Sequence, residues 1–160
     1  MVVVLMGVTG SGKTTIGRLL SQELSWKFYD ADDFHSPANV EKMRNGIPLN
    51  DEDRKPWLQT LNRLIRNCLE RDENALLACS ALKESYRKFL LIDESVRLIY
   101  LKGDYETVQK RLSGRHGHYM NPSLLDSQFE TLEEPEEGLY VDASLNPDEI
   151  VKAIKNYLSI

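Results

Sequence analysis

The 160-residue chain has few cysteines, no long apolar run and no general excess of basic residues. Its two cysteines, Cys68 and Cys79, are too few for a disulfide framework and do not form a Cys-x-x-Cys pair. No stretch approaches the ~20 apolar residues of a membrane span. The first apolar run, Met1–Met6, is too short for a secretory signal and has no basic flank. We therefore expect a reducing, cytoplasmic location and no membrane partner.

The net charge of −5 is unevenly distributed. Residues 126–149 contain nine acidic and no basic residues, whereas residues 1–125 carry a net charge of +2. This pattern argues against a nucleic-acid partner, because such proteins present clusters of basic residues. We expect the acidic stretch to form a solvated surface, and any anion site to lie in the first 125 residues.

Short apolar runs alternate with amphipathic segments, which is typical of a parallel sheet covered by helices on both faces. The β-branched run VVVLM predicts a first strand that is buried on both faces. Asparagine before proline predicts an N-cap followed by the first helical residue. Strands are expected at residues 2–6, 27–30, 75–79, 96–101 and 139–141, and helices from 13, at 39–44, 51–71 and 84–91, from 105, and after the Asn-Pro pairs at 121–122 and 146–147. The sequence therefore predicts one α/β domain, residues 1–160, with a five-stranded parallel sheet in three layers.

The segment Gly7–Thr14 fits the pattern G-x-x-x-x-G-K-[ST] and lies between a predicted strand and a predicted helix. Glycines let backbone N–H groups turn toward phosphate oxygens, and the helix N-terminus favours an anion. The lysine of this pattern contacts the β- and γ-phosphates, and its threonine binds Mg²⁺. We therefore predict ATP and Mg²⁺ as cofactors, held by Gly7, Thr9, Gly10, Ser11, Gly12, Lys13, Thr14 and Thr15.

Asp30 and Asp32 follow the second predicted strand, at the sheet edge where ligands bind in open parallel sheets. A kinase that acts on a hydroxyl needs one carboxylate to orient the nucleophile and another near Mg²⁺. A spacing of two residues places both side chains on one face if the strand continues. The alternative is a capped turn. Because N-K-x-D and D-x-x-G are absent, we favour a small-molecule kinase over a GTPase, and a non-catalytic ATP-sensing protein remains the alternative from another class.

Basic residues that could hold an anionic acceptor lie in two further segments. Arg54 either pairs with Asp51 one turn earlier on the same helix or reaches an acceptor carboxylate. For Asp51 itself we expect a helix cap. Lys83 and Arg87 are four residues apart, so they either present one helical face to an anion or form a solvated surface.

Arg111 and Arg115 flank Ser113-Gly114, an arrangement typical of a mobile lid that closes over a triphosphate, or of an ordinary basic loop. The three histidines, His35, His116 and His118, are not accompanied by other residues in a metal-binding pattern, so we expect polar or structural roles for them.

Together these motifs resemble gluconokinase of the compact P-loop type, a relative of shikimate kinase and adenylate kinase. The resemblance extends from Val2 to Asp142. Its most specific blocks are Pro48-Leu49-Asn50-Asp51 with Trp57-Leu58, and Cys79-Ser80-Ala81-Leu82-Lys83. Further matches are Asp30-x-Asp32-x-x-His35, Arg111-x-x-x-Arg115 and Gln128-Phe129-x-x-Leu132-Glu133-x-Pro135. Proline follows His35 one residue later than is common in the family, which affects the expected orientation of this histidine.

The resemblance implies ATP-dependent phosphorylation of D-gluconate at its 6-hydroxyl, giving 6-phospho-D-gluconate. Phosphorylation of shikimate, a nucleotide or another sugar acid is the alternative. The implied fold is a P-loop kinase of the nucleoside monophosphate and shikimate kinase type, with an acceptor-binding helical insert at about residues 35–72 and a short lid at about 113–121. The resemblance also implies a homodimer as a family-level expectation. The implied roles are catalysis by Lys13, Asp32 and Arg115, Mg²⁺ binding by Thr14 and Asp30, nucleotide contact by Arg111 and Arg115, and acceptor binding by Asp32, His35, Arg54, Lys83, Arg87 and Gln128.

Overall fold

Five short segments form one parallel sheet in the computed structural model, which describes residues 1–113 and 124–160. The strands are β1 (Val2–Met6), β2 (Lys27–Asp30), β3 (Ala75–Ala78), β4 (Val96–Lys102) and β5 (Leu139–Asp142), in the spatial order β2-β3-β1-β4-β5. The helices are α1 (Lys13–Leu24), α2 (Pro37–Arg44), α3 (Asp51–Glu70), α4 (Glu84–Arg87), α5 (Tyr105–Ser113), α6 (Leu124–Thr131) and α7 (Pro147–Leu158), with a 3₁₀ helix η1 (Ala31–Phe34) after β2. The prediction of a five-stranded parallel α/β fold is confirmed.

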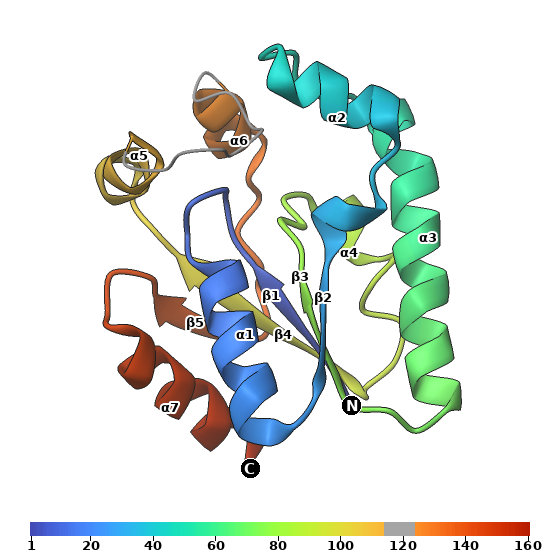
Figure 1. The fold of residues 1–160 in the computed structure, drawn as a ribbon, viewed down its shortest axis with the longest axis vertical. Coiled ribbons are helices and arrows are strands. Elements are labelled where there is room, and N and C mark those ends of the chain that lie inside the picture. Colours follow the sequence, from blue (N-terminus) through green and yellow to red (C-terminus); the bar gives the residue numbers. More distant parts are fainter. Residues whose placement is uncertain (114–123) are drawn as a thin grey trace.

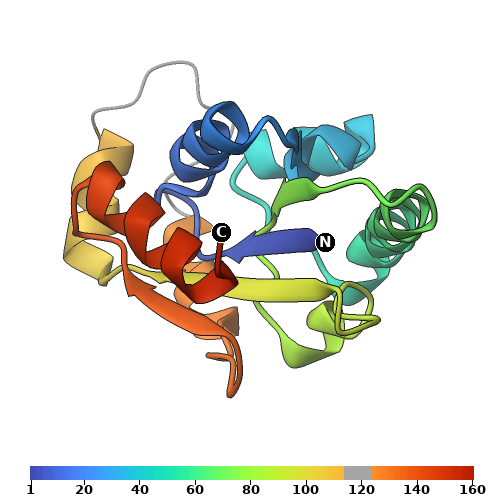
Figure 2. The same cartoon turned by 90° about the horizontal axis from the view of Figure 1, so that it is seen from below.

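Alternation of side chains along β1 builds two hydrophobic cores, one on each face of the sheet. Val3 and Leu5 pack with apolar residues of α1 and α7, whereas Val4 and Met6 pack with apolar residues of α3. All five β1 residues are buried, as expected for a central strand covered on both faces. Figure 2 shows the resulting three layers, with α1 and α7 on one side of the sheet and α3 on the other.

Local hydrogen bonds set the helix boundaries and correct two of the predicted ones. The helix predicted from residue 39 begins at Pro37, because Ser36 is its N-cap and accepts a hydrogen bond from the Asn39 N–H. The helix predicted at 84–91 ends at Arg87, and the N–H groups of Phe89 and Leu90 bond three residues back, as in turns. The helix predicted after Asn121-Pro122 is present as α6, although residues 121–123 lie outside the described part of the chain.

The carboxyl ends of the strands bring three loops to one edge of the sheet. Asp30 of β2 is paired with Ala78 of β3, and Ala78 is paired with Leu5 of β1. The chain segments that follow these residues therefore leave the sheet at the same level. Figure 1 shows this edge at the top of the molecule, with α2, α5 and α6 around it and both termini at the opposite end. Within the described residues, no helix combines the length and the apolar character that a membrane crossing needs.

Candidate active site

The segment Gly7–Thr14 forms a tight loop between β1 and α1, as its sequence predicts. Gly10 and Gly12 adopt positive φ angles of 80° and 101°, which a residue with a side chain would adopt only under strain. The Lys13 ammonium lies across the loop and donates hydrogen bonds to the carbonyl oxygens of Gly7 (2.8 Å) and Val8 (2.9 Å). The buried Ser11 hydroxyl has no hydrogen-bond partner among the described residues. A glycine-lined loop with a lysine and a helix N-terminus is chemically suited to phosphate.

Asp30 joins the end of β2 to this loop. Its Oδ2 accepts a hydrogen bond from the Thr14 hydroxyl at 3.2 Å, and its Oδ1 accepts one from the Asp32 backbone N–H at 3.0 Å. Hydroxyl and carboxylate oxygens suit Mg²⁺, which commonly keeps several waters and phosphate oxygens as its other ligands. No cluster of three or more His, Cys, Asp or Glu side chains able to hold a metal occurs in residues 1–113 and 124–160. The donor set therefore fits Mg²⁺ bound together with a phosphorylated ligand.

The strand ends at Asp30, so the condition under which both carboxylates would lie on one strand face is not met. Asp30 instead caps η1, and the chain turns through this 3₁₀ helix. Both carboxylates nevertheless line one cavity with the phosphate loop. The two readings of the sequence, a capped turn and a shared site, are thus compatible.

Two adjoining cavities meet at Asp32 and Ser80. The first is lined by the phosphate loop, Asp30 and the end of β3. The second lies between η1, α2, α3 and α6, and its lining includes His35, Met43, Leu49, Arg54, Trp57 and Leu124. Among the described residues, only Asp32 and Ser80 line both cavities, and both have polar side chains. A group bound in the second cavity would therefore face a group bound in the first across these two side chains.

His35 and Trp57 form one wall of the second cavity. Their rings stack with centroids 4.2 Å apart and an angle of 15° between planes. The Trp57 indole N–H is itself fixed by donating to the Ala31 carbonyl at 2.7 Å. Burial, reinforced by the positive charge of Arg54, lowers the pKa of His35 to about 4. The imidazole is therefore neutral at pH 7, and it can form hydrogen bonds without carrying a charge.

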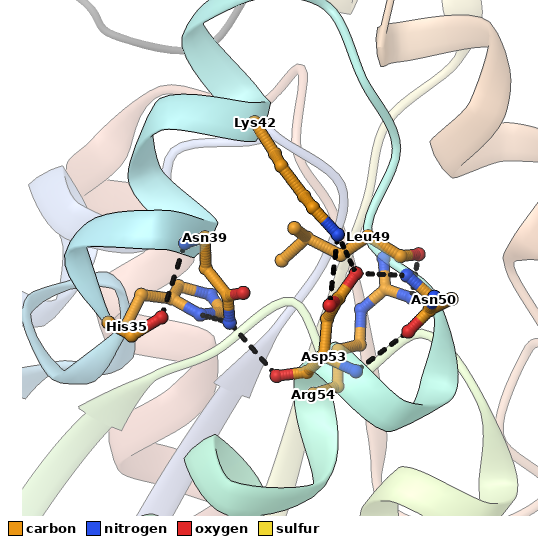
Figure 3. A network of polar contacts seen from close by, with 8 residues as sticks. His35, Asn39, Lys42, Leu49, Asn50, Asp53 and Arg54 are labelled. Atoms are coloured by element: carbon orange, nitrogen blue, oxygen red, sulfur yellow. Dashed lines mark hydrogen bonds and ion pairs between the residues drawn. The ribbon is translucent and has the colours of Figure 1, made fainter.

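A polar network between α2 and α3 holds this wall in place (Figure 3). The buried Asn39 amide donates to the Asp53 carbonyl at 2.9 Å and lies 3.4 Å from the His35 Nδ1. Lys42 forms an ion pair with the Asp53 carboxylate at 2.9 Å, and this carboxylate also completes a capping box with Asn50. Figure 3 shows these groups converging from both helices. The network fixes the angle at which α2 meets the start of α3, and so the position of His35.

Arg54 lies in the second cavity and does not pair with Asp51. Its Nη1 donates to the Leu49 carbonyl (2.7 Å) and to the Tyr86 hydroxyl (3.0 Å), and its guanidinium lies over the Tyr86 ring. Tyr86 in turn donates to Asp51 at 2.5 Å, and Lys83 forms an ion pair with Asp51 at 3.3 Å. The hydrogen bonds from Tyr86 and then Lys83 lower the pKa of Asp51. Asp51 is therefore a partner of Tyr86 and Lys83, and the N-cap that we expected it to form is Asn50.

Lys83 and Arg87 do not present one face to the second cavity. Arg87 is only 5% exposed and donates to the Ala81 carbonyl at 2.7 Å, supporting a loop in which Ala81 has a positive φ of 46°. Burial lowers the pKa of Arg87. Its position behind the loop, away from the cavity lining, argues for a structural contribution and against the predicted contact with an acceptor.

Arg111 and Gln128 contact the phosphate loop from outside. The Arg111 guanidinium donates to the carbonyl oxygens of Gly10 (3.4 Å), Ser11 (3.3 Å) and Ala143 (2.6 Å). The Gln128 side-chain oxygen accepts a hydrogen bond from the Thr9 N–H at 2.8 Å. Gln128 thus contacts Thr9, which lines the first cavity, and is not among the residues that line the second cavity. Thr15 is exposed on α1, and Arg115, His116 and His118 lie outside the described residues, as do residues 114–121 of the predicted lid.

Sequence reasoning gave no role to Ser80, Trp57 or Tyr86. Ser80 follows β3 at the ligand-binding edge of the sheet, and this position in the sequence could have indicated a role in the site. The functions of Trp57 and Tyr86 depend on partners 26 to 35 residues away, which spacing along one helix does not reveal.

Comparisons with known proteins agree with this geometry. The family model described as shikimate kinase matches residues 9–154. A probable gluconokinase from Dictyostelium discoideum is 42% identical over 172 residues, which cover 99% of this chain and 86% of that protein. The crystal structure of a gluconokinase from Sinorhizobium meliloti superposes with a TM-score of 0.86 at 36% identity, covering 98% of this chain and 90% of that one. The crystal structure of a sugar kinase from Janibacter superposes with a TM-score of 0.92 at 42% identity, covering 99% of this chain and 94% of that one. The chain therefore belongs to the gluconokinase family, within the group of P-loop kinases that the shikimate kinase model describes.

Proposed function

We propose that this protein transfers the γ-phosphoryl group of ATP to the 6-hydroxyl of D-gluconate, giving 6-phospho-D-gluconate and ADP. The observation that carries the proposal is the position of Asp32, which lines both the phosphate cavity and the adjoining cavity. A carboxylate between donor and acceptor can orient a hydroxyl and accept its proton. The kinship with gluconokinases from several organisms supports gluconate as the acceptor.

The second cavity offers the groups that a sugar acid requires. Arg54 supplies a guanidinium whose planar fork matches a carboxylate, and Tyr86 and the Leu49 carbonyl hold it in place. Neutral His35 and the hydroxyls of Ser80 and Ser127 offer hydrogen bonds to a polyol. We propose that Arg54 binds the carboxylate and that the chain of hydroxyl groups extends toward Asp32. Lys83 then acts mainly by charge, because it is paired with Asp51.

On the nucleotide side, the N–H groups of the phosphate loop and Lys13 bind the phosphates of ATP. Lys13 exchanges its contacts with the Gly7 and Val8 carbonyls for phosphate oxygens. Thr14 and Asp30 would hold Mg²⁺, which supplies neutralisation of the developing phosphate charge when it is bound. Arg111 steadies the outer side of the loop through the carbonyls of Gly10 and Ser11. For Arg115 we propose the role expected from the sequence, which is to stabilise the charge that develops on the transferred phosphoryl group.

During the reaction, Asp32 holds the 6-hydroxyl in line with the γ-phosphorus and takes up its proton as the new P–O bond forms. The bond between the γ-phosphorus and the β,γ-bridging oxygen breaks, and ADP leaves. The residues that line the second cavity, which is the acceptor cavity in this proposal, limit the orientation of the sugar acid. This is how positioning contributes to phosphoryl transfer.

Release of ADP across a panel of acceptors tests this proposal. The panel contains D-gluconate, shikimate, adenosine monophosphate and other aldonates, each with ATP and Mg²⁺. We expect a kcat/KM for gluconate at least tenfold above that of every other acceptor. A different preferred acceptor would reassign the kinase, and nucleotide binding without acceptor-dependent ADP would indicate the ATP-sensing alternative.

A further inference from the structure

Helix α6 joins the two cavities. Its residue Leu124 packs with Met43 of α2 and with Leu49, next to the acceptor cavity. One turn later, the Gln128 side chain accepts a hydrogen bond from the Thr9 N–H of the phosphate loop at 2.8 Å. Residues four apart lie on one face of a helix, so α6 reaches the acceptor cavity and the phosphate loop with the same face. Figure 1 shows α6 and α2 at the same end of the molecule, at the top of the view.

Helix α6 also packs against the phosphate loop on its nucleotide side. Leu125 packs with Val8 of the phosphate loop and with Val108 of α5. On the other side, both Leu124 and Ser127 line the acceptor cavity. An acceptor that touches Leu124 or Ser127 therefore also acts on the short helix that carries Gln128.

The hydrogen bond from Thr9 to Gln128 fixes the start of the phosphate loop. A loop N–H held by a side chain cannot turn freely toward or away from a ligand, and the neighbouring peptide planes are held with it. We propose that Gln128 is a positioning residue which couples occupation of the acceptor cavity to the conformation of the phosphate loop. This inference rests on the proposed function, because it takes gluconate as the acceptor.

Coupling of this kind is reciprocal, so the acceptor tightens nucleotide binding by the same factor by which nucleotide tightens acceptor binding. Loss of one neutral hydrogen bond corresponds to a change of about fivefold in an equilibrium constant. We expect gluconate to tighten the binding of a non-hydrolysable ATP analogue with Mg²⁺ by about fivefold or more. The Gln128→Leu variant should bring that ratio close to one.

Isothermal titration calorimetry of the full chain measures the ratio, using the analogue with and without saturating gluconate. Gln128→Glu keeps a side-chain oxygen that can accept a hydrogen bond from the Thr9 N–H, so it should keep the ratio. Any effect of its charge on nucleotide affinity is present with and without gluconate and therefore cancels in the ratio. Glu130→Gln, an exposed change on the same helix, is the matched control. A wild-type ratio of one, or an unchanged ratio in Gln128→Leu, would overturn the proposal.

A second measurement needs no variant and so does not depend on Gln128→Leu folding. In protein labelled with ¹⁵N-threonine, gluconate alone should shift the Thr9 amide signal, and an unmoved signal contradicts coupling. If gluconate supports no release of ADP in the acceptor panel and does not bind in the presence of the analogue, the proposed function and the acceptor half of the inference both fail. The Gln128–Thr9 half is then tested by analogue affinity without acceptor, which Gln128→Leu should weaken about fivefold; equal affinities would overturn it.

Discussion

Replacing Asp32 with asparagine removes the proposed proton acceptor while keeping the size of the side chain. Asp32 is part-exposed at the junction of the two cavities, so the amide can still orient a hydroxyl by hydrogen bonding. What is lost is general-base catalysis, which contributes about 10²- to 10⁴-fold in rate. We therefore expect kcat to fall on the order of 100-fold or more, equivalent to about 3 kcal/mol or more in the activation free energy.

The same change should leave nucleotide binding intact or slightly stronger, because it removes a negative charge near the triphosphate. ADP release coupled to oxidation of a reduced nicotinamide gives kcat and KM, and calorimetry with an ATP analogue gives the dissociation constant. Asp33→Asn is the matched control, since Asp33 is the adjacent, exposed residue of η1. If Asp32→Asn kept more than about a tenth of the wild-type kcat, the assignment of Asp32 as the base would be refuted.

Three further changes test the acceptor cavity. Arg54→Gln should raise the KM for gluconate by about 10- to 100-fold, the scale of a lost hydrogen bond to a charged group; kcat should change less, and the exposed Arg63→Gln on the same helix should change neither. For His35, the folded-state pKa of about 4 lies below the ordinary value of 6.5. As pH falls from about 6.5 to 4, the unfolded chain therefore takes up a proton that the folded chain does not, and stability is lost. Over that pH range, the free energy of unfolding measured in urea should fall by roughly 2 kcal/mol less in His35→Gln than in wild type, after allowance for the partly exposed ring. Equal decreases in the two proteins would contradict the buried neutral imidazole. Asn39→Ala should lower the free energy of unfolding by about 1–2 kcal/mol, because it leaves the Asp53 carbonyl without its amide donor, and a change below 0.5 kcal/mol would argue against the network in Figure 3.

Local sequence patterns predicted the sheet and the phosphate loop correctly because both depend on neighbouring residues. The run Val2–Met6 is apolar at every position, which a central parallel strand requires. Gly10 and Gly12 occupy positions of positive φ that few other residues adopt. The pairing of Thr14 with Asp30 follows from the strand order, which places β2 and the loop at the same edge.

The parts that sequence patterns did not predict depend on contacts between distant segments. A spacing of four suggested that Lys83 and Arg87 share a face, but α4 ends at Arg87, and that side chain is buried against Ala81. Gln128 carries no signal of its contact with Thr9, which lies 119 residues away in the sequence. Whether Arg54 pairs with Asp51 was open from the sequence alone. The structure decides the question because Tyr86 lies between the two and bonds to both.

Identification of the product tests the central claim most directly. Protein, ATP, Mg²⁺ and D-gluconate are incubated, and the product is examined by two-dimensional ¹H–³¹P correlation spectroscopy. The account predicts one new phosphate ester whose phosphorus couples to the two protons on C6 of gluconate, formed together with an equal amount of ADP. An ester at another hydroxyl, or no ester while nucleotide is bound, would contradict it.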